Sequence, residues 1–98
     1  MKRVYISGKM NGLTKTQYFR RFLEAEKELT SRGYSAVNPC MIDGLPLSRS
    51  EYLLVDMMLL DFCDAIYMLT NWEDSEGAKA ELKRAEELGL EIMYEGEN

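Results

Sequence analysis

Apolar residues along this chain fall into two alternating patterns. A short continuous run occupies residues 4–6, and short, mainly apolar segments occupy 34–37, 64–70 and 90–94. Such runs are typical of strands that are buried on both faces. Between them lie three longer stretches in which apolar side chains recur every three or four positions, which predicts amphipathic helices. The pattern therefore predicts strands and helices in alternation, with a strand at each end.

Capping signals indicate where the helices begin and end. Two capping boxes and two glycines provide them: Thr14 with Gln17, Ser48 with Glu51, Gly33 and Gly89. We expect one helix between Thr14 and Gly33 and a second over about 49–62, and either Asp74 or Ser75 can cap the third. The other expected segments are the end of that third helix near residue 88, an irregular connection over 40–47 and a frayed tail over 96–98.

The order of these elements predicts the fold class. Strand–helix–strand connections of these lengths are right-handed crossovers between parallel strands, so helices cover both faces of the sheet. We predict a compact three-layer α/β fold of the Rossmann or flavodoxin-like type, one domain over residues 1–98, with about four strands in the order 2-1-3-4. In such a sheet the ligand crevice lies at the carboxyl ends of the strands where the winding direction reverses. The loops over 7–13 and 71–77 should therefore border the crevice.

Composition narrows the classes of partner. The 98 residues include 12 basic and 17 acidic side chains, and the net charge of −5 repels a polyanion such as duplex nucleic acid. A small anion such as a mononucleotide is compatible with that charge. Small size and the methionine-rich second helix, with Met57 and Met58, favour a homo-oligomer. The first apolar run is too short for a membrane span or a signal peptide, so no membrane partner and a cytoplasmic location are expected.

The residue types that are missing limit the possible chemistry. The chain contains no histidine, so acid–base or nucleophilic chemistry falls to carboxylates, Tyr, Lys or Ser. Cys40 and Cys63 lack the paired spacing of a zinc site or a redox motif, and we expect buried free thiols. No metal site is predicted.

Asp56 interrupts an apolar helix face. Its neighbours at helical spacings are Tyr52, Leu53, Leu59, Leu60 and Cys63. Burying an unpaired carboxylate costs several kcal/mol. Asp56 is therefore either paired with a cation or with donors inside the fold, or it faces a pocket in which a substrate supplies those donors.

Two segments at the expected crevice hold further candidates. The loop after the first strand has two glycines and begins with Ser7, Gly8, Lys9 and Met10. Its backbone can approach a ligand closely, although a plain tight turn would use the same residues. In the third helix, Glu81 is either a solvated carboxylate in a network of surface charges or a group that leans back over the crevice.

Three separated segments carry a family resemblance. They are Tyr-Ile-Ser-Gly at positions 5–8, Asp56 eight residues before Asp64, and the run Asp74-Ser75-x-Gly77-x-x-x-Glu81-Leu82. Their order and spacing resemble the nucleoside 2-deoxyribosyltransferase superfamily, including its small relatives that hydrolyse deoxynucleoside monophosphates. That family has N-D…A-D and D-S-G-T-x-x-E-L-G patterns in the same order.

The resemblance implies cleavage of an N-glycosidic bond, or deoxyribosyl transfer, on a nucleoside or nucleotide, without a metal or organic cofactor. It implies Glu81 as the nucleophile, Asp56 as the carboxylate that orients the sugar and assists proton transfer, and Tyr5 as a hydroxyl near the nucleophile. The residues implied in substrate binding are Ser7, Gly8, Lys9, Met10, Asp74, Ser75 and Gly77.

Departures from the family pattern support a second function. Lys83 and Arg84 follow Glu81-Leu82 where the family has Gly-Tyr, and Glu76 adds a negative charge beside the implied phosphate site. The alternative is a catalytically silent protein that binds or sequesters a nucleotide or sugar nucleotide on the same fold. A structural subunit whose aromatic loops serve assembly is a third possibility.

Overall fold

The computed structural model of the chain describes residues 1–97. Its elements are, in order, β1 (Arg3–Ser7), α1 (Lys15–Ser31), β2 (Ser35–Val37), the short 3-10 helix η1 (Pro39–Ile42), α2 (Arg49–Asp61), β3 (Ala65–Met68), the 3-10 helix η2 (Trp72–Asp74), α3 (Glu76–Leu88) and β4 (Glu91–Tyr94). The predicted alternation of strands and helices is confirmed. Asn98, at the end of the predicted frayed tail, lies outside the described residues.

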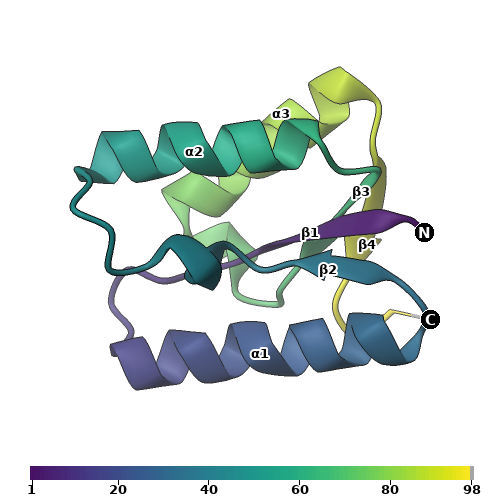
Figure 1. The fold of residues 1–98 in the computed structure, drawn as a ribbon, viewed down its shortest axis with the longest axis horizontal. Coiled ribbons are helices and arrows are strands. Elements are labelled where there is room, and N and C mark those ends of the chain that lie inside the picture. The colour runs from purple at the N-terminus through teal and green to yellow at the C-terminus, as the bar shows by residue number, and fades with distance from the viewer. Residues whose placement is uncertain (98) are drawn as a thin grey trace.

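The four strands form one parallel sheet in the order β2-β1-β3-β4, as predicted. Tyr5 in β1 lies beside Val37 of β2 on one side and Ile66 of β3 on the other. Helix α1 covers one face of the sheet, and α2 and α3 cover the other (Figure 1). The three-layer α/β architecture is therefore also confirmed.

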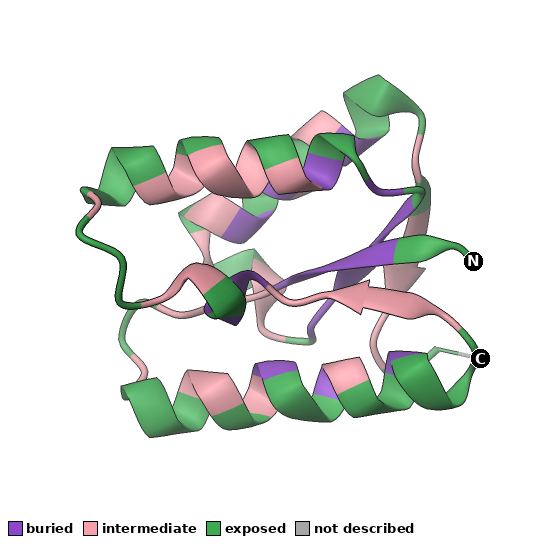
Figure 2. Ribbon diagram, in the orientation of Figure 1, coloured by how far each residue is buried: buried purple, intermediate pink, exposed green. Residues whose placement is uncertain are grey.

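Alternating side chains of the central strands divide the core into two clusters. Val4 and Ile6 of β1 pack with buried residues of α1 such as Phe22. Tyr5, between them in sequence, points to the opposite face and packs with Leu60 of α2 and with α3. Both inner strands are buried along most of their length, whereas the outer helix surfaces are exposed (Figure 2). Strand period two thus directs Tyr5 toward the α2–α3 layer.

The helix ends follow the predicted caps. Both capping boxes form, and the Ser75 side chain, rather than Asp74, caps α3 by accepting the Ala78 N–H. Gly33 and Gly89 adopt positive φ angles of 88° and 71° just beyond α1 and α3, as a helix C-terminus favours.

Two segments differ from the sequence expectation. The connection over 40–47 is not wholly irregular, because the Asn38 side chain accepts the Cys40 N–H and starts η1. Strand β3 is shorter than the predicted 64–70. The Thr70 N–H donates to the Glu95 carboxylate instead of to a neighbouring strand, so the ladder ends before it.

Other expectations concern the surface and the thiols. Cys40 and Cys63 are buried and free, as predicted, and burial raises the pKa of these thiols to about 12 and about 11.

Three large apolar side chains of α2 and its C-cap are exposed: Leu54, Met58 and Phe62. The predicted homo-oligomer stays a prediction. Within residues 1–97, no helix is long and apolar enough to cross a membrane.

Candidate active site

Glu81 lies inside the protein, between α3 and the sheet. Only 6% of its surface is exposed. The Tyr5 hydroxyl donates to Oε2 of Glu81 and the Ser7 hydroxyl donates to Oε1, each at 2.6 Å. Tyr5 and Ser7 are two residues apart on β1, so both side chains project from the same face of the strand. The buried position excludes the interpretation of Glu81 as a solvated surface carboxylate.

The sequence of α3 explains why this carboxylate faces inward. Ala78 and Ala85 are buried and lie three residues before and four residues after Glu81, on the same side of the helix. Their small side chains allow α3 to lie close to the central strands. The side chain of Glu81 therefore reaches the hydroxyls of β1.

Asp56 occupies the neighbouring helix α2 and faces the same space. Its Oδ1 atom is buried and has no hydrogen-bond partner among the described residues. Burial, and to a lesser extent the negative charge of Glu81, raises the pKa of Asp56 from its ordinary 3.8 to about 7. The sequence left two interpretations of Asp56 open: pairing inside the fold, or facing a substrate pocket. The lack of a partner for Oδ1 favours the second interpretation.

A cavity of about 680 Å³ brings the candidates together at the carboxyl end of β1. Tyr5, Asp56 and Glu81 all line it. Of the predicted substrate-binding residues, four also line it: Gly8, Met10, Ser75 and Gly77. Its volume is within the range of about 300–1,000 Å³ that small-molecule pockets have.

Three predicted binding residues lie elsewhere. Ser7 is fully buried behind Glu81, and its hydroxyl bonds to that carboxylate. Lys9 and Asp74 do not line the cavity. Lys9 contributes its backbone instead, because its N–H donates to Oδ1 of Asn71 at 3.0 Å. This bond joins the two loops that were expected to border the crevice.

Gly8 allows those loops to pack closely. A Cβ atom at this position would lie 2.6–2.9 Å from three side-chain atoms of Leu69. Such distances are too short for ordinary packing, so only glycine fits here without a shift of its surroundings. Packing against Leu69 thus explains the glycine at this position.

Asn11 and Glu76 also line the cavity, in the two segments that the sequence placed at the crevice. Sequence reasoning missed the remaining lining residues, which are Phe22, Pro39, residues 48–50, Tyr52, Leu53 and Ala78. A signal was present for part of this set, since Tyr52 and Leu53 precede Asp56 by one helical turn and share its face. Pro39 follows β2, so the rule that ligands bind at the carboxyl ends of strands could also have identified it.

The two carboxyl groups affect each other. Burial raises the pKa of Glu81 from its ordinary 4.5 to about 7, although hydrogen bonds from Ser7 and then Tyr5 lower it. Asp56 has a similarly raised pKa and receives no such donors at Oδ1. Two interacting acids in one cavity titrate as a pair, and near neutral pH they share protons.

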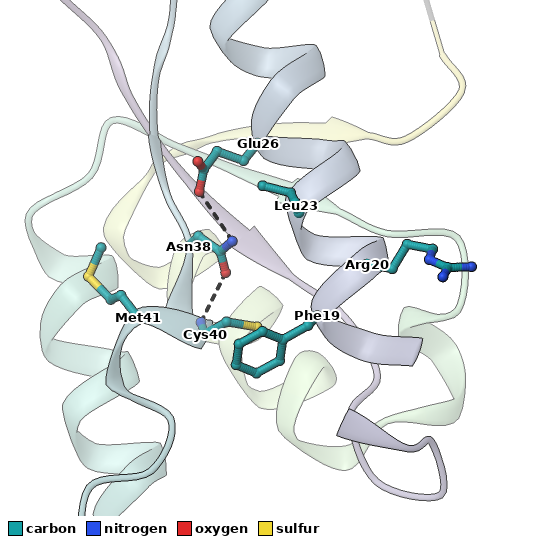
Figure 3. A pocket seen from close by; sticks show the side chains of 7 residues that line it. All are labelled: Phe19, Arg20, Leu23, Glu26, Asn38, Cys40 and Met41. Carbon is teal, nitrogen blue, oxygen red and sulfur yellow. Dashed lines mark hydrogen bonds between the residues drawn. The ribbon is translucent and has the colours of Figure 1, made fainter. Parts of the chain in front are cut away.

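A second hollow of about 330 Å³ lies between α1 and the segment around η1 (Figure 3). Asn38 donates its amide to Glu26 at 3.2 Å and accepts the Cys40 N–H at 2.9 Å, which holds the turn beside the helix. No predicted site residue lines this hollow.

Across residues 1–97, no three His, Cys, Asp or Glu side chains are grouped so that they could hold a metal ion.

Comparison with solved structures shows where this fold occurs. The structure of the Clostridium botulinum CMP N-glycosidase BcmB matches with a TM-score of 0.64 and 22% sequence identity, over 99% of this chain and 73% of that one. The 2-deoxyribosyltransferase from Leishmania mexicana matches with a TM-score of 0.75 and 17% identity, over 96% of this chain. This chain spans 63% of the length of the Leishmania chain. At these identities the likeness concerns the fold.

The chain therefore shares the α/β fold of these two structures, which confirms the fold that the resemblance in the sequence implies. The chain belongs to the family described as domain of unknown function DUF4406, whose model matches residues 2–94. A search of curated proteins finds no match.

Proposed function

We propose that the protein cleaves the N-glycosidic bond of a nucleoside or nucleotide, or transfers its deoxyribosyl group, through Glu81. The observation that supports this most is the convergence of Tyr5, Asp56 and Glu81 on one cavity of suitable size. The two solved structures described above are named for N-glycosidic cleavage and for deoxyribosyl transfer. In this proposal the substrate is a nucleobase joined to a sugar, and the carboxyl groups act without a cofactor.

In the first step, an oxygen of the Glu81 carboxylate attacks C1′ of the sugar. The C1′–N bond breaks, and its electron pair leaves with the base. Asp56 donates a proton to the departing base and becomes a carboxylate. The product is a covalent glycosyl–enzyme, reached through an oxocarbenium-like transition state.

In the second step, a water molecule or a second base attacks C1′ from the face that the first base left. Asp56 takes a proton from the attacking group, and the bond between C1′ and Glu81 breaks with its electron pair returning to the carboxylate. Two inversions give overall retention at C1′. Water gives hydrolysis, and a second base gives transfer.

The reaction needs Glu81 ionised and Asp56 protonated. Burial raises the pKa of both groups to about 7, so near neutral pH the pair can hold one proton between them. The hydroxyls of Tyr5 and Ser7 stabilise the ionised form of Glu81, whereas Oδ1 of Asp56 receives no hydrogen bond among the described residues. These contacts support the assignment of Glu81 as the nucleophile and Asp56 as the acid.

The alternative function, binding without catalysis, was suggested by Lys83 and Arg84 together with Glu76. Glu76 lines the cavity, but Lys83 and Arg84 do not, and Arg84 donates to Asp61 of α2 at 3.1 Å on the protein surface. These two cations therefore give no reason to expect a silent site. A bound nucleotide that is never cleaved would still favour this alternative.

The direct test is to incubate the wild-type protein with each common deoxynucleoside, ribonucleoside and their monophosphates, alone and with a second free base. Chromatography should detect a released base, or a new nucleoside when a second base is present. Release of base from none of these compounds would contradict catalysis. Thermal-shift measurements on the same panel then distinguish a silent binder, which is stabilised by an uncleaved compound.

The Tyr5→Phe variant tests the tuning of the nucleophile. Removing this hydroxyl removes a donor that lowers the pKa of Glu81, so that pKa should rise. Glu81 must be ionised to attack, so the acid limb of the profile of kcat/KM against pH should move up by about 1–2 units. Activity at neutral pH should fall, and it should not recover at higher pH, where Asp56 loses the proton that it donates. Tyr94→Phe, outside the cavity, is the control; an unmoved limb in Tyr5→Phe would refute this role.

A further inference from the structure

The two carboxylate oxygens of Glu81 have different partners and different surroundings. Oε2 accepts a hydrogen bond from the Tyr5 hydroxyl and Oε1 accepts one from the Ser7 hydroxyl, each at 2.6 Å. Tyr5 lines the cavity together with Glu81, whereas Ser7 does not line it and has no exposed surface. These surroundings favour Oε2 as the oxygen that meets a substrate and Oε1 as the oxygen that is held in the interior.

The position of Ser7 fixes its hydroxyl in one place. Ser7 is the last residue of β1, it lies beside Met68 in the ladder with β3, and its main-chain oxygen accepts the Leu69 N–H at 2.8 Å. A serine hydroxyl has a single proton to donate, and that of Ser7 is given to Oε1 of Glu81. The donor therefore belongs to a buried strand, so it cannot follow the carboxylate if that group moves.

The proposed reaction gives the two oxygens different tasks. When Oε2 forms the bond to C1′, it becomes the bridging oxygen of an ester, which is a weak acceptor. Oε1 becomes the carbonyl oxygen of that ester and still accepts from Ser7. When the ester breaks, the electron pair returns to Oε2 and both oxygens again share the negative charge. The bond from Ser7 strengthens in this step, because hydrogen bonds to charged acceptors are stronger than those to neutral ones.

We propose that Ser7 is a positioning residue: its hydroxyl stays bonded to Oε1 of Glu81 throughout the reaction, while Oε2 forms and breaks the bond to C1′. The inference rests on the proposed function, because it assigns the two oxygens of the proposed nucleophile. Ser7 acts through Glu81 and does not touch the substrate. Its largest effect falls on the second step, in which it stabilises the carboxylate that leaves C1′.

The lifetime of the glycosyl–enzyme isolates this effect. The bond from Ser7 also lowers the pKa of Glu81, but this affects only the first step, because the carboxyl group is already esterified in the second. Ser7→Ala should therefore lengthen the lifetime of the glycosyl–enzyme by about 10-fold, since a hydrogen bond to a charged group contributes more than one to a neutral group.

The test uses the protein in excess over the compound that the wild type cleaves, so that each protein molecule reacts at most once. Samples are quenched at intervals, and mass spectrometry measures the fraction that carries a glycosyl group. The rate at which this fraction falls reports the second step. Ser7→Ala and Ser7→Cys should both lower this rate, because Cys restores the side-chain volume but is only a weak donor.

Ser35→Ala is the matched control, because it makes the same change on β2 and outside the cavity. It should leave the lifetime unchanged. Thermal unfolding near pH 5, where Glu81 holds its proton in the folded protein, shows that each variant is folded.

The outcomes separate this inference from the proposed function. A longer lifetime in both Ser7 variants, with an unchanged lifetime in Ser35→Ala, supports the inference. A lifetime in Ser7→Ala or Ser7→Cys equal to that of the wild type overturns the role of Ser7 and leaves the reaction standing. Base release without a glycosyl–enzyme in any of these proteins also overturns that role. Release of base from none of the compounds by the wild type overturns the reaction, and the inference with it.

Discussion

Glu81→Gln is expected to reduce base release by about 1,000-fold or more, because a neutral amide cannot replace a carboxylate as the nucleophile. Glutamine has nearly the same shape and can still bond to the hydroxyls of Tyr5 and Ser7. The loss should therefore appear in kcat rather than in substrate binding. The measurement is the rate of base release by chromatography, with KM or a ligand affinity determined in parallel.

The covalent intermediate offers an independent readout of the same role. Wild-type protein mixed with substrate and quenched rapidly should show a mass increase of one glycosyl group, located on the peptide that contains Glu81. Glu81→Gln should show none. Glu86→Gln serves as the matched control, since it makes the same change on an exposed turn of α3. Undiminished base release by Glu81→Gln would remove this residue from the mechanism.

The second large effect concerns stability and does not depend on the reaction. The folded protein holds a proton on Glu81 up to a pH of about 7, whereas the unfolded chain loses it near the ordinary pKa of 4.5. Between these values the folded state binds more protons, so the free energy of unfolding falls as pH rises. This contribution is fully present below pH 4.5 and is lost as pH rises through 7. It corresponds to about 3 kcal/mol.

Glu81→Gln should therefore be more stable than the wild type by about 3 kcal/mol at pH 8 relative to the difference at pH 4. Urea unfolding at a series of pH values measures this difference and cancels the titration of the other carboxylates. The raised pKa of Asp56 predicts the same sign of change for Asp56→Asn. A difference in stability that does not vary with pH in either variant would show that neither carboxyl group has a raised pKa.

Most of the fold was predictable because its signals are local. The capping box of Thr14 and Gln17 and the Ser75 cap specify helix starts within four residues of chain. The parallel order then follows from crossover handedness. The inward direction of Glu81 was not predictable from α3 alone, since this helix carries several carboxylates. It depends on hydroxyls contributed by β1, 74 and 76 positions away in sequence.

The rest of the site could not be predicted for a similar reason. Its second wall comes from η1 and the start of α2, which have no chemical motif and reach the cavity only through packing. Ser7 was expected to contact the substrate, and the structure places it against Glu81 instead. From sequence, a serine that supports a carboxylate and a serine that binds a ligand look the same, because both follow a buried strand.

The side chains of helix α3 are held differently along its length. Glu81 is fixed by hydrogen bonds from Tyr5 and Ser7 of β1, whereas the side chain of Glu76, about one and a half turns earlier, stands in solvent. Glu76 also lines the cavity, so a replacement there changes the rim without disturbing the bonds that fix Glu81. The rim is therefore open to redesign with no repair required in the interior.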